Sequence, residues 1–257
     1  MTAELAAHLA ASGLAGTVAT PVSACIDNAR RMLAGDPDYT FGLSAWQQAT
    51  FDETVEALRA CGVSLSEHPA GLPFVDPAVA AAGVERHRRG FARAAAGHAR
   101  VLLATGHAFA LLPHYQALAA ALSAAGCAVL QPLDGSRGLF TEADGRSASI
   151  RYYGGVAAIV IHGGIEHTHR AHYMEAMIAE LGGPAAVDVV FADHGYAGAA
   201  VEAGVQTYSI ADVNDPALPL ARWLGRTDGV LVIDDGLNPS AYEPVTKAII
   251  DGDDERR

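Results

Sequence analysis

From about residue 99 onward the chain alternates between short apolar runs and segments with helical spacing, and this alternation constrains the fold most. Apolar strands separated by helices indicate a mainly parallel sheet that helices cover on both faces. We therefore predict an α/β fold, a Rossmann-like three-layer sandwich. The expected strands are 101–105, 128–133, 147–153, 156–161, 187–192, 205–211 and 230–233, and the expected helices are 111–125, 172–181, 197–203, 218–224 and 242–250. Segments 147–153 and 156–161 form either a hairpin around Gly154–Gly155 or two consecutive strands.

The first 95 residues follow a different pattern, because they are mostly helical. Segments 2–11 and 52–61 have helical spacing, and 76–96 is rich in Ala and Arg, with Pro77 near its start and Gly97 just past its end. The segments between them carry turn-forming residues. We expect a helical N-terminal cap over 1–95, an α/β catalytic core over 96–250 and a charged tail over 251–257, all in one integrated domain.

Composition and charge narrow the class of protein. The chain is 51% hydrophobic and 18% charged, which is typical of a globular enzyme. Its net charge of −12 disfavours nucleic acid as a partner, since phosphate backbones are bound by basic patches. A signal peptide is not indicated, and no run approaches the roughly 18–20 apolar residues of a membrane span. We expect a cytoplasmic protein that does not contact a membrane, with three reduced cysteines and an oligomeric state left open, a homo-oligomer included.

Polar side chains gather where the predicted strands end. Thr105-Gly106-His107 follows one strand, and Asp193-His194-Gly195 follows the most apolar strand of the chain. In an open parallel sheet the carboxyl ends of the strands share one crevice, and helix N-termini at that edge attract anions. A carboxylate after an apolar strand is costly unless it orients a histidine, binds a metal or accepts N–H bonds. The alternatives are a tight turn at Gly106 and a helix N-cap at Asp193.

The segment after another predicted strand is rich in histidine. His167-Thr168-His169 follows the predicted strand 156–161. An extended H-x-H pattern places both imidazoles on one side, as metal ligation or a paired acid and base requires. The alternative is two histidines on a loop surface. We interpret the neighbouring His162 and His172 as structural.

Carboxylates follow the last two predicted strands. Asp212 ends one of them and is a candidate site residue, whereas Asp215-Pro216 has the pattern of an N-cap and first helical residue. Asp234 and Asp235 are interpreted as turn formers, with acid/base catalysis or metal binding as the alternative. The sequence contains no P-loop and no G-x-S-x-G nucleophile elbow.

Collinear motifs across most of the chain resemble a family of actinobacterial small-molecule phosphatases. One member of that family is linked to histidinol-phosphate dephosphorylation. The matching segments are LAGTVAT at 14–20, GDP and FGL within 35–43, ATGH with LL, YQALA and AAGC within 104–127, HTH at 167–169, ADHG at 192–195 and IADVNDPAL at 210–218. The stretch EHTHRAHY, which ends at Tyr173, is richer in histidine than the family pattern. A phosphorylated specialised metabolite is therefore an alternative substrate to histidinol phosphate.

The resemblance implies phosphomonoester hydrolysis in small-molecule biosynthesis, and the residues leave the mechanism open. The catalytic candidates are His107, His167, His169, Asp193 and His194, and the substrate- and phosphate-binding candidates are Thr20, Thr105, Gly106 and Asp212. A divalent metal ion of unspecified identity, held by His167, His169 and Asp193, would activate water. Direct acid/base chemistry and a phosphohistidine intermediate are the other routes. Two rival functions remain: a metal-dependent hydrolase or lyase acting on a non-phosphorylated substrate, and a non-catalytic domain that senses a phosphosugar or nucleotide.

Overall fold

The computed structural model describes residues 2–66, 68, 70–135, 139–142 and 144–251, so all but the first residue of the predicted tail 251–257 lies outside the described part. The N-terminal region contains α1 (Thr2–Ala11), β1 (Gly16–Thr17), α2 (Val22–Leu33), α3 (Pro37–Thr40), the 3-10 helix η1 (Ala45–Gln48), α4 (Phe51–Ala60), β2 (Val63–Ser64), β3 (Phe74–Val75) and α5 (Pro77–Ala96). The three helices predicted here are present. The small sheet of order β1-β3-β2 was not predicted, and neither were α2, α3 and η1. Two-residue strands are too short to show a period in the sequence.

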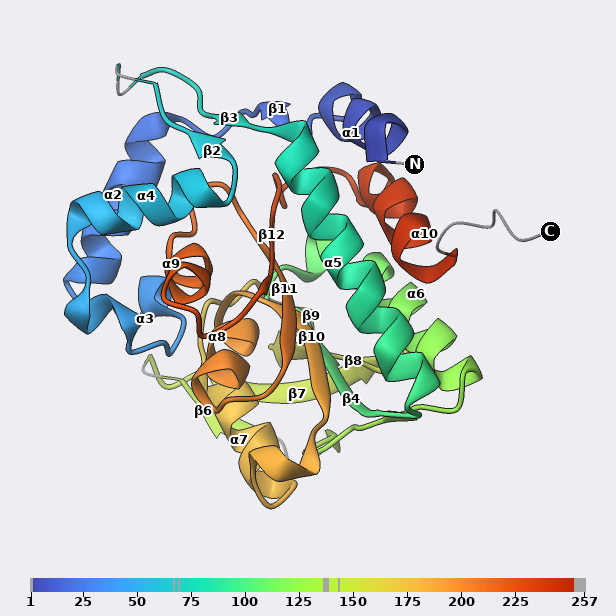
Figure 1. The fold of residues 1–257 in the computed structure, drawn as a ribbon. Coiled ribbons are helices and arrows are strands. Elements are labelled where there is room, and N and C mark those ends of the chain that lie inside the picture. The colour runs from blue at the N-terminus through green and yellow to red at the C-terminus, as the bar shows by residue number, and fades with distance from the viewer. Residues whose placement is uncertain (1, 67, 69, 136–138, 143, 252–257) are drawn as a thin grey trace.

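The described residues from 100 onward build a nine-stranded sheet (Figure 1). Its strands are β4 (Arg100–Ala104), β5 (Ala128–Val129), β6 (Leu139–Thr141), β7 (Ser147–Tyr153), β8 (Val156–Ile161), β9 (Gly164–Ile165), β10 (Val189–Asp193), β11 (Thr207–Ala211) and β12 (Gly229–Val232). The helices are α6 (Ala108–Ala124), α7 (His172–Glu180), η3 (Pro184–Ala186), α8 (His194–Glu202), α9 (Ala217–Trp223), η4 (Pro239–Tyr242) and α10 (Glu243–Asp251). Helix α6 begins three residues earlier than predicted, and the strand predicted over 128–133 is only two residues long.

The sheet is mostly parallel, as predicted. Strands β12, β11, β10, β4 and β8 are parallel neighbours in that order, and β5 also pairs in parallel with β4. The hairpin alternative holds for the next pair, because β7 and β8 are antiparallel across the tight turn at Gly154–Gly155. Strands β6 and β9 are also antiparallel to their neighbours. The antiparallel part therefore forms one edge of a mixed α/β sheet.

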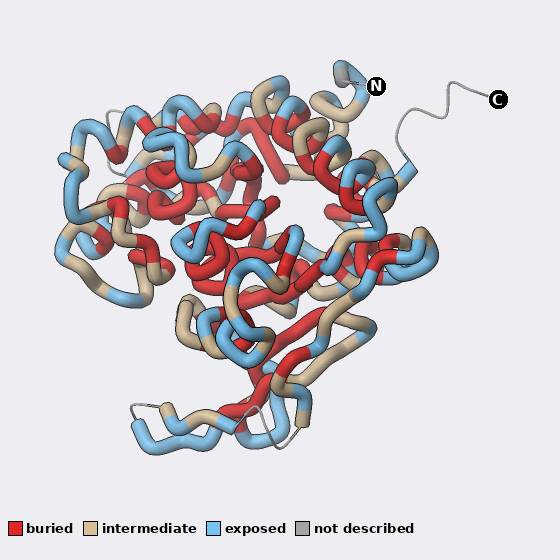
Figure 2. The backbone as a smooth tube through the Cα atoms, turned by 60° about the horizontal axis from the view of Figure 1, so that its bottom comes forward, coloured by how far each residue is buried: buried red, intermediate tan, exposed pale blue. Residues whose placement is uncertain are grey.

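Helices cover the parallel strands. Every residue of β10, β11 and β12 is buried, which accounts for the near-continuous apolar runs in the sequence (Figure 2). Helices α5, α6 and α10 pack against one another, and α7, α8 and α9 form a second group (Figure 1). The Rossmann-like three-layer assignment and the domain boundaries stay predictions. None of the helices within the described residues combines the length and the apolar character that crossing a bilayer requires.

Candidate active site

The site lies where the strand order reverses. The chain passes from β4 through α6 towards β8 on one side, and later returns to place β10 on the other side of β4. Loops that leave two such strands in opposite directions leave a crevice at their carboxyl ends, where ligands bind in open α/β sheets. Gly106 and His107 follow β4, and Asp193 and His194 lie at the junction of β10 and α8. Both motifs predicted from the strand ends therefore lie at the same edge of the sheet, after two neighbouring parallel strands.

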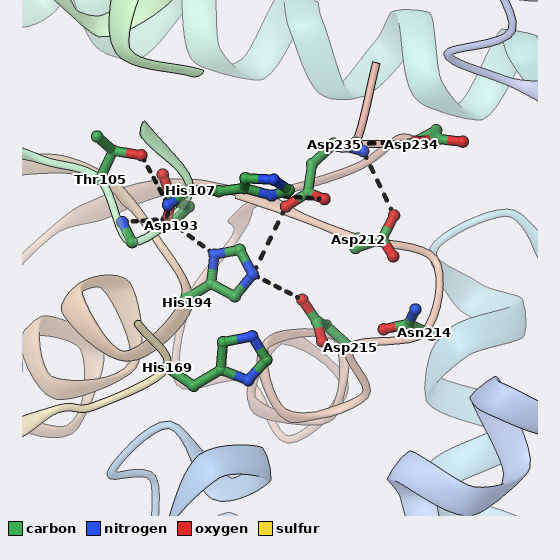
Figure 3. Close-up of polar contacts among 12 residues, drawn as sticks. Thr105, His107, His169, Asp193, His194, Asp212, Asn214, Asp215, Asp234 and Asp235 are labelled. Atoms are coloured by element: carbon green, nitrogen blue, oxygen red, sulfur yellow. Dashed lines mark hydrogen bonds and ion pairs between the residues drawn. The ribbon is translucent and has the colours of Figure 1, made fainter. Parts of the chain in front are cut away.

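Asp193 joins the two sides of this crevice (Figure 3). Its Oδ1 accepts the backbone N–H of Gly106 at 2.6 Å and that of His107 at 3.2 Å. The same oxygen lies 2.8 Å from Nδ1 of His194, which donates to it. The carboxylate is fully buried and makes no capping bond to α8, so the N-cap alternative for its side chain does not hold. Asp193 instead positions the loop after β4 and the imidazole of His194.

Three carboxylates surround the buried ring of His194. Its Nε2 lies 3.5 Å from Oδ2 of Asp215 and 3.6 Å from Oδ2 of Asp235, opposite the bond to Asp193. Burial disfavours the charged imidazole, but the Asp193 hydrogen bond and the charges of Asp215 and Asp235 outweigh it and raise the pKa of His194 to about 10. In this arrangement His194 is an imidazolium at neutral pH.

His107 forms the other link to the carboxylates. It immediately precedes α6, and its Nδ1 lies 3.1 Å from Oδ1 of Asp235. Burial lowers the pKa of His107, but the contact with Asp235 is stronger and the net shift is upward. Burial raises the pKa of Asp235, but the contacts with His107 and His194 lower it by more. The net shift is downward, so the carboxylate stays charged. One carboxylate thus bridges two histidines that come from different strand ends.

The predicted H-x-H pair completes a group of four histidines, namely His107, His167, His169 and His194. The ring of His167 lies 4.5 Å from that of His107 and 5.1 Å from that of His194, measured between centroids. The ring of His169 lies 4.7 Å from that of His194. Burial lowers the pKa of His167 to about 4 and that of His169 to about 3, so both are neutral at pH 7.

Two glycines permit this close approach. A Cβ at Gly106 would lie 2.2 Å from the carbonyl oxygen of Thr168, and a Cβ at Gly195 would lie 2.2 Å from that of His169. Any side chain at either position would push the H-x-H segment away from β4 and β10. The Thr-Gly-His and Asp-His-Gly motifs are therefore sequence signatures of this packing as well as of the side chains they carry.

Asp38 is a site residue that the sequence analysis missed. Its backbone oxygen accepts a bond of 2.7 Å from Nδ1 of His169, which leaves Nε2 of His169 with its lone pair. Its carboxylate pairs with Arg170, whose Nε lies 2.8 Å from Asp38 Oδ1. No local signal marks Asp38, because it comes from α3 in the N-terminal region and reaches the site only through tertiary packing.

Asp215 and Asp235 correct two sequence interpretations. Pro216 is the N-cap of α9, and the buried carboxylate of Asp215 faces His194 instead of capping that helix. Asp235 is not merely a turn former, because it contacts His107. Each follows the end of a parallel strand closely, and this rule could have placed both in the site. The nearby Asp212 accepts a weak bond of 3.3 Å from the backbone N–H of Asp235.

Burial disfavours negative charge on two of the carboxylates in this cluster. Burial raises the pKa of Asp215 to about 7, and burial together with Asp235 and Asp215 raises that of Asp212 well above its usual range. The oxygens Asp215 Oδ2 and Asp235 Oδ2 are buried and have no hydrogen-bond partner in the described part of the chain. Buried carboxylate oxygens without donors are unfavourable, and a divalent cation would satisfy both.

Among the described residues, two groups of donor atoms could hold such a cation, each with its atoms within 4.8 Å of one another. They are His107, His167 and His194, and His194, Asp215 and Asp235. The predicted set of His167, His169 and Asp193 is not reproduced. His167 belongs to one group, but His169 and Asp193 belong to neither.

Only some of the predicted phosphate-binding residues lie in the candidate site. Thr105 is buried, and its Oγ1 accepts the backbone N–H of His107 at 3.0 Å, so it shapes the loop after β4. Gly106 lies in the same loop, and Asp212 lies among the carboxylates. Thr20 precedes α2, and no described contact joins it to this cluster.

Two hollows flank His167, and Glu166 and His167 line both. One has a volume of about 530 Å³ and is lined mainly by charged and polar side chains, including Asp38, Arg146 and Arg170. The other has a volume of about 330 Å³ and is lined by His107, Ala108, Phe109, Ile165, Glu166 and His167. The histidine group is therefore accessible from two sides of different character.

Comparisons with known proteins agree with this chemistry. A family model described as Phosphatase matches residues 1–254. A curated phosphatase of Streptomyces coelicolor is 34% identical over 254 residues, which cover 96% of this chain and 94% of that protein. No solved structure matches the chain significantly. The chain therefore belongs to the Phosphatase family, whose members are hydrolases that act on phosphate esters.

Proposed function

We propose that this enzyme hydrolyses small-molecule phosphate monoesters at the crevice between β4 and β10. The observation that carries the proposal is the junction at Asp193, which ties the loop after β4 to His194 while Asp215 and Asp235 face the same imidazole. The site combines an anion-attracting helix terminus, imidazoles and buried carboxylates. Phosphoryl transfer requires such positioned charges, because catalysis consists mainly of orienting the nucleophile and neutralising the equatorial oxygens.

The phosphoryl group is proposed to bind beside His107 at the start of α6. The first-turn N–H groups of Ala108 and Phe109 have no intrahelical acceptor, and the helix dipole favours an anion there. His107 and His167 both line the hollow at this terminus. Thr105 and Gly106 contribute by fixing the loop, and Asp212 contributes to the carboxylate group instead of contacting phosphate.

A divalent cation fits the group His194, Asp215 and Asp235, since both carboxylates present a buried oxygen without a hydrogen bond, and it would take the place of the proton on His194 Nε2. When bound there, it would neutralise phosphoryl charge and activate water. Mg²⁺ and Mn²⁺ prefer oxygen ligands, whereas Zn²⁺ also suits a mixed His and Asp set. The carboxylates would then hold the ion, with Asp193 orienting His194 through Nδ1.

The neutral histidines are proposed to handle protons. His169 donates from Nδ1 to the carbonyl of Asp38, so its Nε2 is free to accept a proton. A phosphohistidine at His194 is disfavoured. Its Nδ1 is held by Asp193, and its Nε2 faces Asp215 and Asp235, which would repel a phosphoryl group.

The proposed substrates are small phosphorylated metabolites, with histidinol phosphate and phosphorylated specialised metabolites as the first to test. The test is a phosphate-release screen over such metabolites with Mg²⁺, Mn²⁺ or Zn²⁺ and without added metal. Asp235→Asn should lower both turnover and bound metal. Asp228→Asn is the matched control, because Asp228 is exposed at the opposite end of β12.

Three outcomes would contradict the proposal. If the purified protein releases no phosphate from any monoester with any of the three metals, the enzymatic assignment is wrong. Tight binding of phosphate esters without turnover would support a sensor domain instead. Equal metal content and equal turnover in Asp235→Asn and Asp228→Asn would remove the carboxylate group from the mechanism.

A further inference from the structure

An exposed aromatic side chain lies beside the histidine group. Phe109 is 75% exposed, and Ile165 is 40% exposed. Phe109 comes two residues after His107, and Ile165 comes two residues before His167. These two apolar side chains, together called the apolar shelf below, line the hollow of about 330 Å³ that also contains both imidazoles.

Regular structure holds both residues of the apolar shelf in place. Phe109 lies in the first turn of α6, a helix of 17 residues. Ile165 lies in β9 and pairs in register with Val160 of β8. A binding surface built on a helix and a strand is more exactly positioned than one on a loop.

We propose that the apolar shelf binds the organic part of the substrate, so that the enzyme acts on phosphate monoesters of apolar, in particular aromatic, alcohols. This inference rests on the proposed function, because it takes the phosphoryl group to lie at His107 and His167. In a phosphate monoester, a single oxygen joins the phosphoryl group to the alcohol. The first atoms of the alcohol therefore lie against the nearest walls of the hollow, which are Phe109 and Ile165.

Burial of apolar surface then favours an apolar alcohol over a hydroxylated one. A ligand ring would cover surface that Phe109 exposes to water, which is favourable in proportion to the area covered. A polyol placed there would lose hydrogen bonds to water without gaining protein partners on the shelf. The apolar shelf thus discriminates by the chemistry of the leaving group.

The polar hollow on the other side of His167 is less suited to this role, because its charges are already paired. Arg170 contacts Asp38 at 2.8 Å, and Arg146 contacts Asp144 at 2.6 Å. A substrate group would have to compete with these ion pairs. The apolar shelf has no such internal partner to displace.

The experiment compares phenyl phosphate with glycerol 2-phosphate in the wild type, in Phe109→Ala and in Phe74→Ala. Phe74 is the matched control, because it is also exposed, at 46%, but lies in the small sheet on β3. Phe109→Ala should lower kcat/KM for phenyl phosphate about tenfold relative to glycerol 2-phosphate, the scale of one apolar contact in a pocket. Comparing the ratio between variants cancels the intrinsic reactivity of the two esters.

A binding measurement separates this inference from the proposed function. Phenylphosphonate should bind about tenfold more weakly to Phe109→Ala than to the wild type, while inorganic phosphate should bind both equally. This test does not require turnover. If the wild type hydrolyses monoesters but Phe109→Ala leaves both the ester ratio and phenylphosphonate binding unchanged, the apolar shelf is not a substrate site. A change of oligomeric state in Phe109→Ala with unchanged selectivity would instead assign the shelf to a contact between copies.

Discussion

Replacing Asp193 with asparagine tests the junction between β4 and β10 most directly. The change keeps the shape of the side chain and removes its charge. An amide oxygen can still accept the N–H groups of Gly106 and His107, so the loop after β4 should keep its path. What is lost is the charged partner of His194 Nδ1 at 2.8 Å.

The expected magnitudes follow from these three bonds. Hydrogen bonds to a charged group contribute about 1.5–3 kcal/mol, compared with about 1 kcal/mol for neutral pairs. We therefore expect Asp193→Asn to lower the free energy of unfolding by about 2 kcal/mol, which a folded domain tolerates. Turnover should fall by about 10²–10⁴-fold, because the imidazole loses the group that orients it.

Phosphate release measures turnover, and urea unfolding measures stability. Asp188→Asn is the matched control, since Asp188 lies just before the opposite end of β10 and pairs with Arg100 on the surface. Its turnover should stay within about twofold of the wild type. If Asp193→Asn folds and retains wild-type turnover, Asp193 does not organise the reaction centre.

Three further predictions concern packing and pH. Gly106→Ala places a Cβ 2.2 Å from the carbonyl oxygen of Thr168. We expect the free energy of unfolding to fall by about 1–3 kcal/mol, and the rate of phosphate release to fall by a larger proportion than the free energy of unfolding. His162→Gln, at an exposed turn, should change kcat by less than about twofold. Burial lowers the pKa of His87 to about 4 from 6.5, so the unfolded chain takes up the proton first. The contribution of His87 to the free energy of unfolding should be constant above pH 6.5 and fall by about 3 kcal/mol as the pH drops to about 4. In His87→Gln, whose amide can also donate to Gly229, urea midpoints should fall less between pH 6.5 and 4 than in the wild type; an unchanged pH profile would refute the assignment.

The strand and helix pattern could be predicted from the sequence because periodicity is a local property. The apolar runs around β10 and β11 reflect burial of a parallel sheet on both faces, and this burial is recorded in consecutive residues. The sequence also predicted that His107 and Asp193 lie at one edge of the sheet, because each comes at the end of a strand and parallel strands end at the same edge. Placing both residues at the same edge needed no knowledge of strand order.

Partner choice within the site depended on tertiary structure. Asp38, Asp215 and Asp235 reach His169, His194 and His107 across long stretches of chain. Asp215 and Asp235 follow β11 and β12, and their distances to the histidines follow from the order β12-β11-β10-β4-β8, which places β4 beside β10. Asp38 reaches the site through the packing of α3 in the N-terminal region. Strand order comes from the packing of whole elements, and no local period encodes it.

The chemical state of each imidazole was likewise decided by its surroundings. The sequence grouped His167, His169 and His194 as equivalent candidates. Burial keeps the first two neutral, whereas three carboxylates hold a proton on the third. Residue type and spacing thus determined which side chains meet at the edge of the sheet. Only the folded arrangement of charges and buried surface determined which ring nitrogen donates, which accepts and which side chains could together hold a cation, because electrostatic interactions depend on distance and dielectric environment in three dimensions.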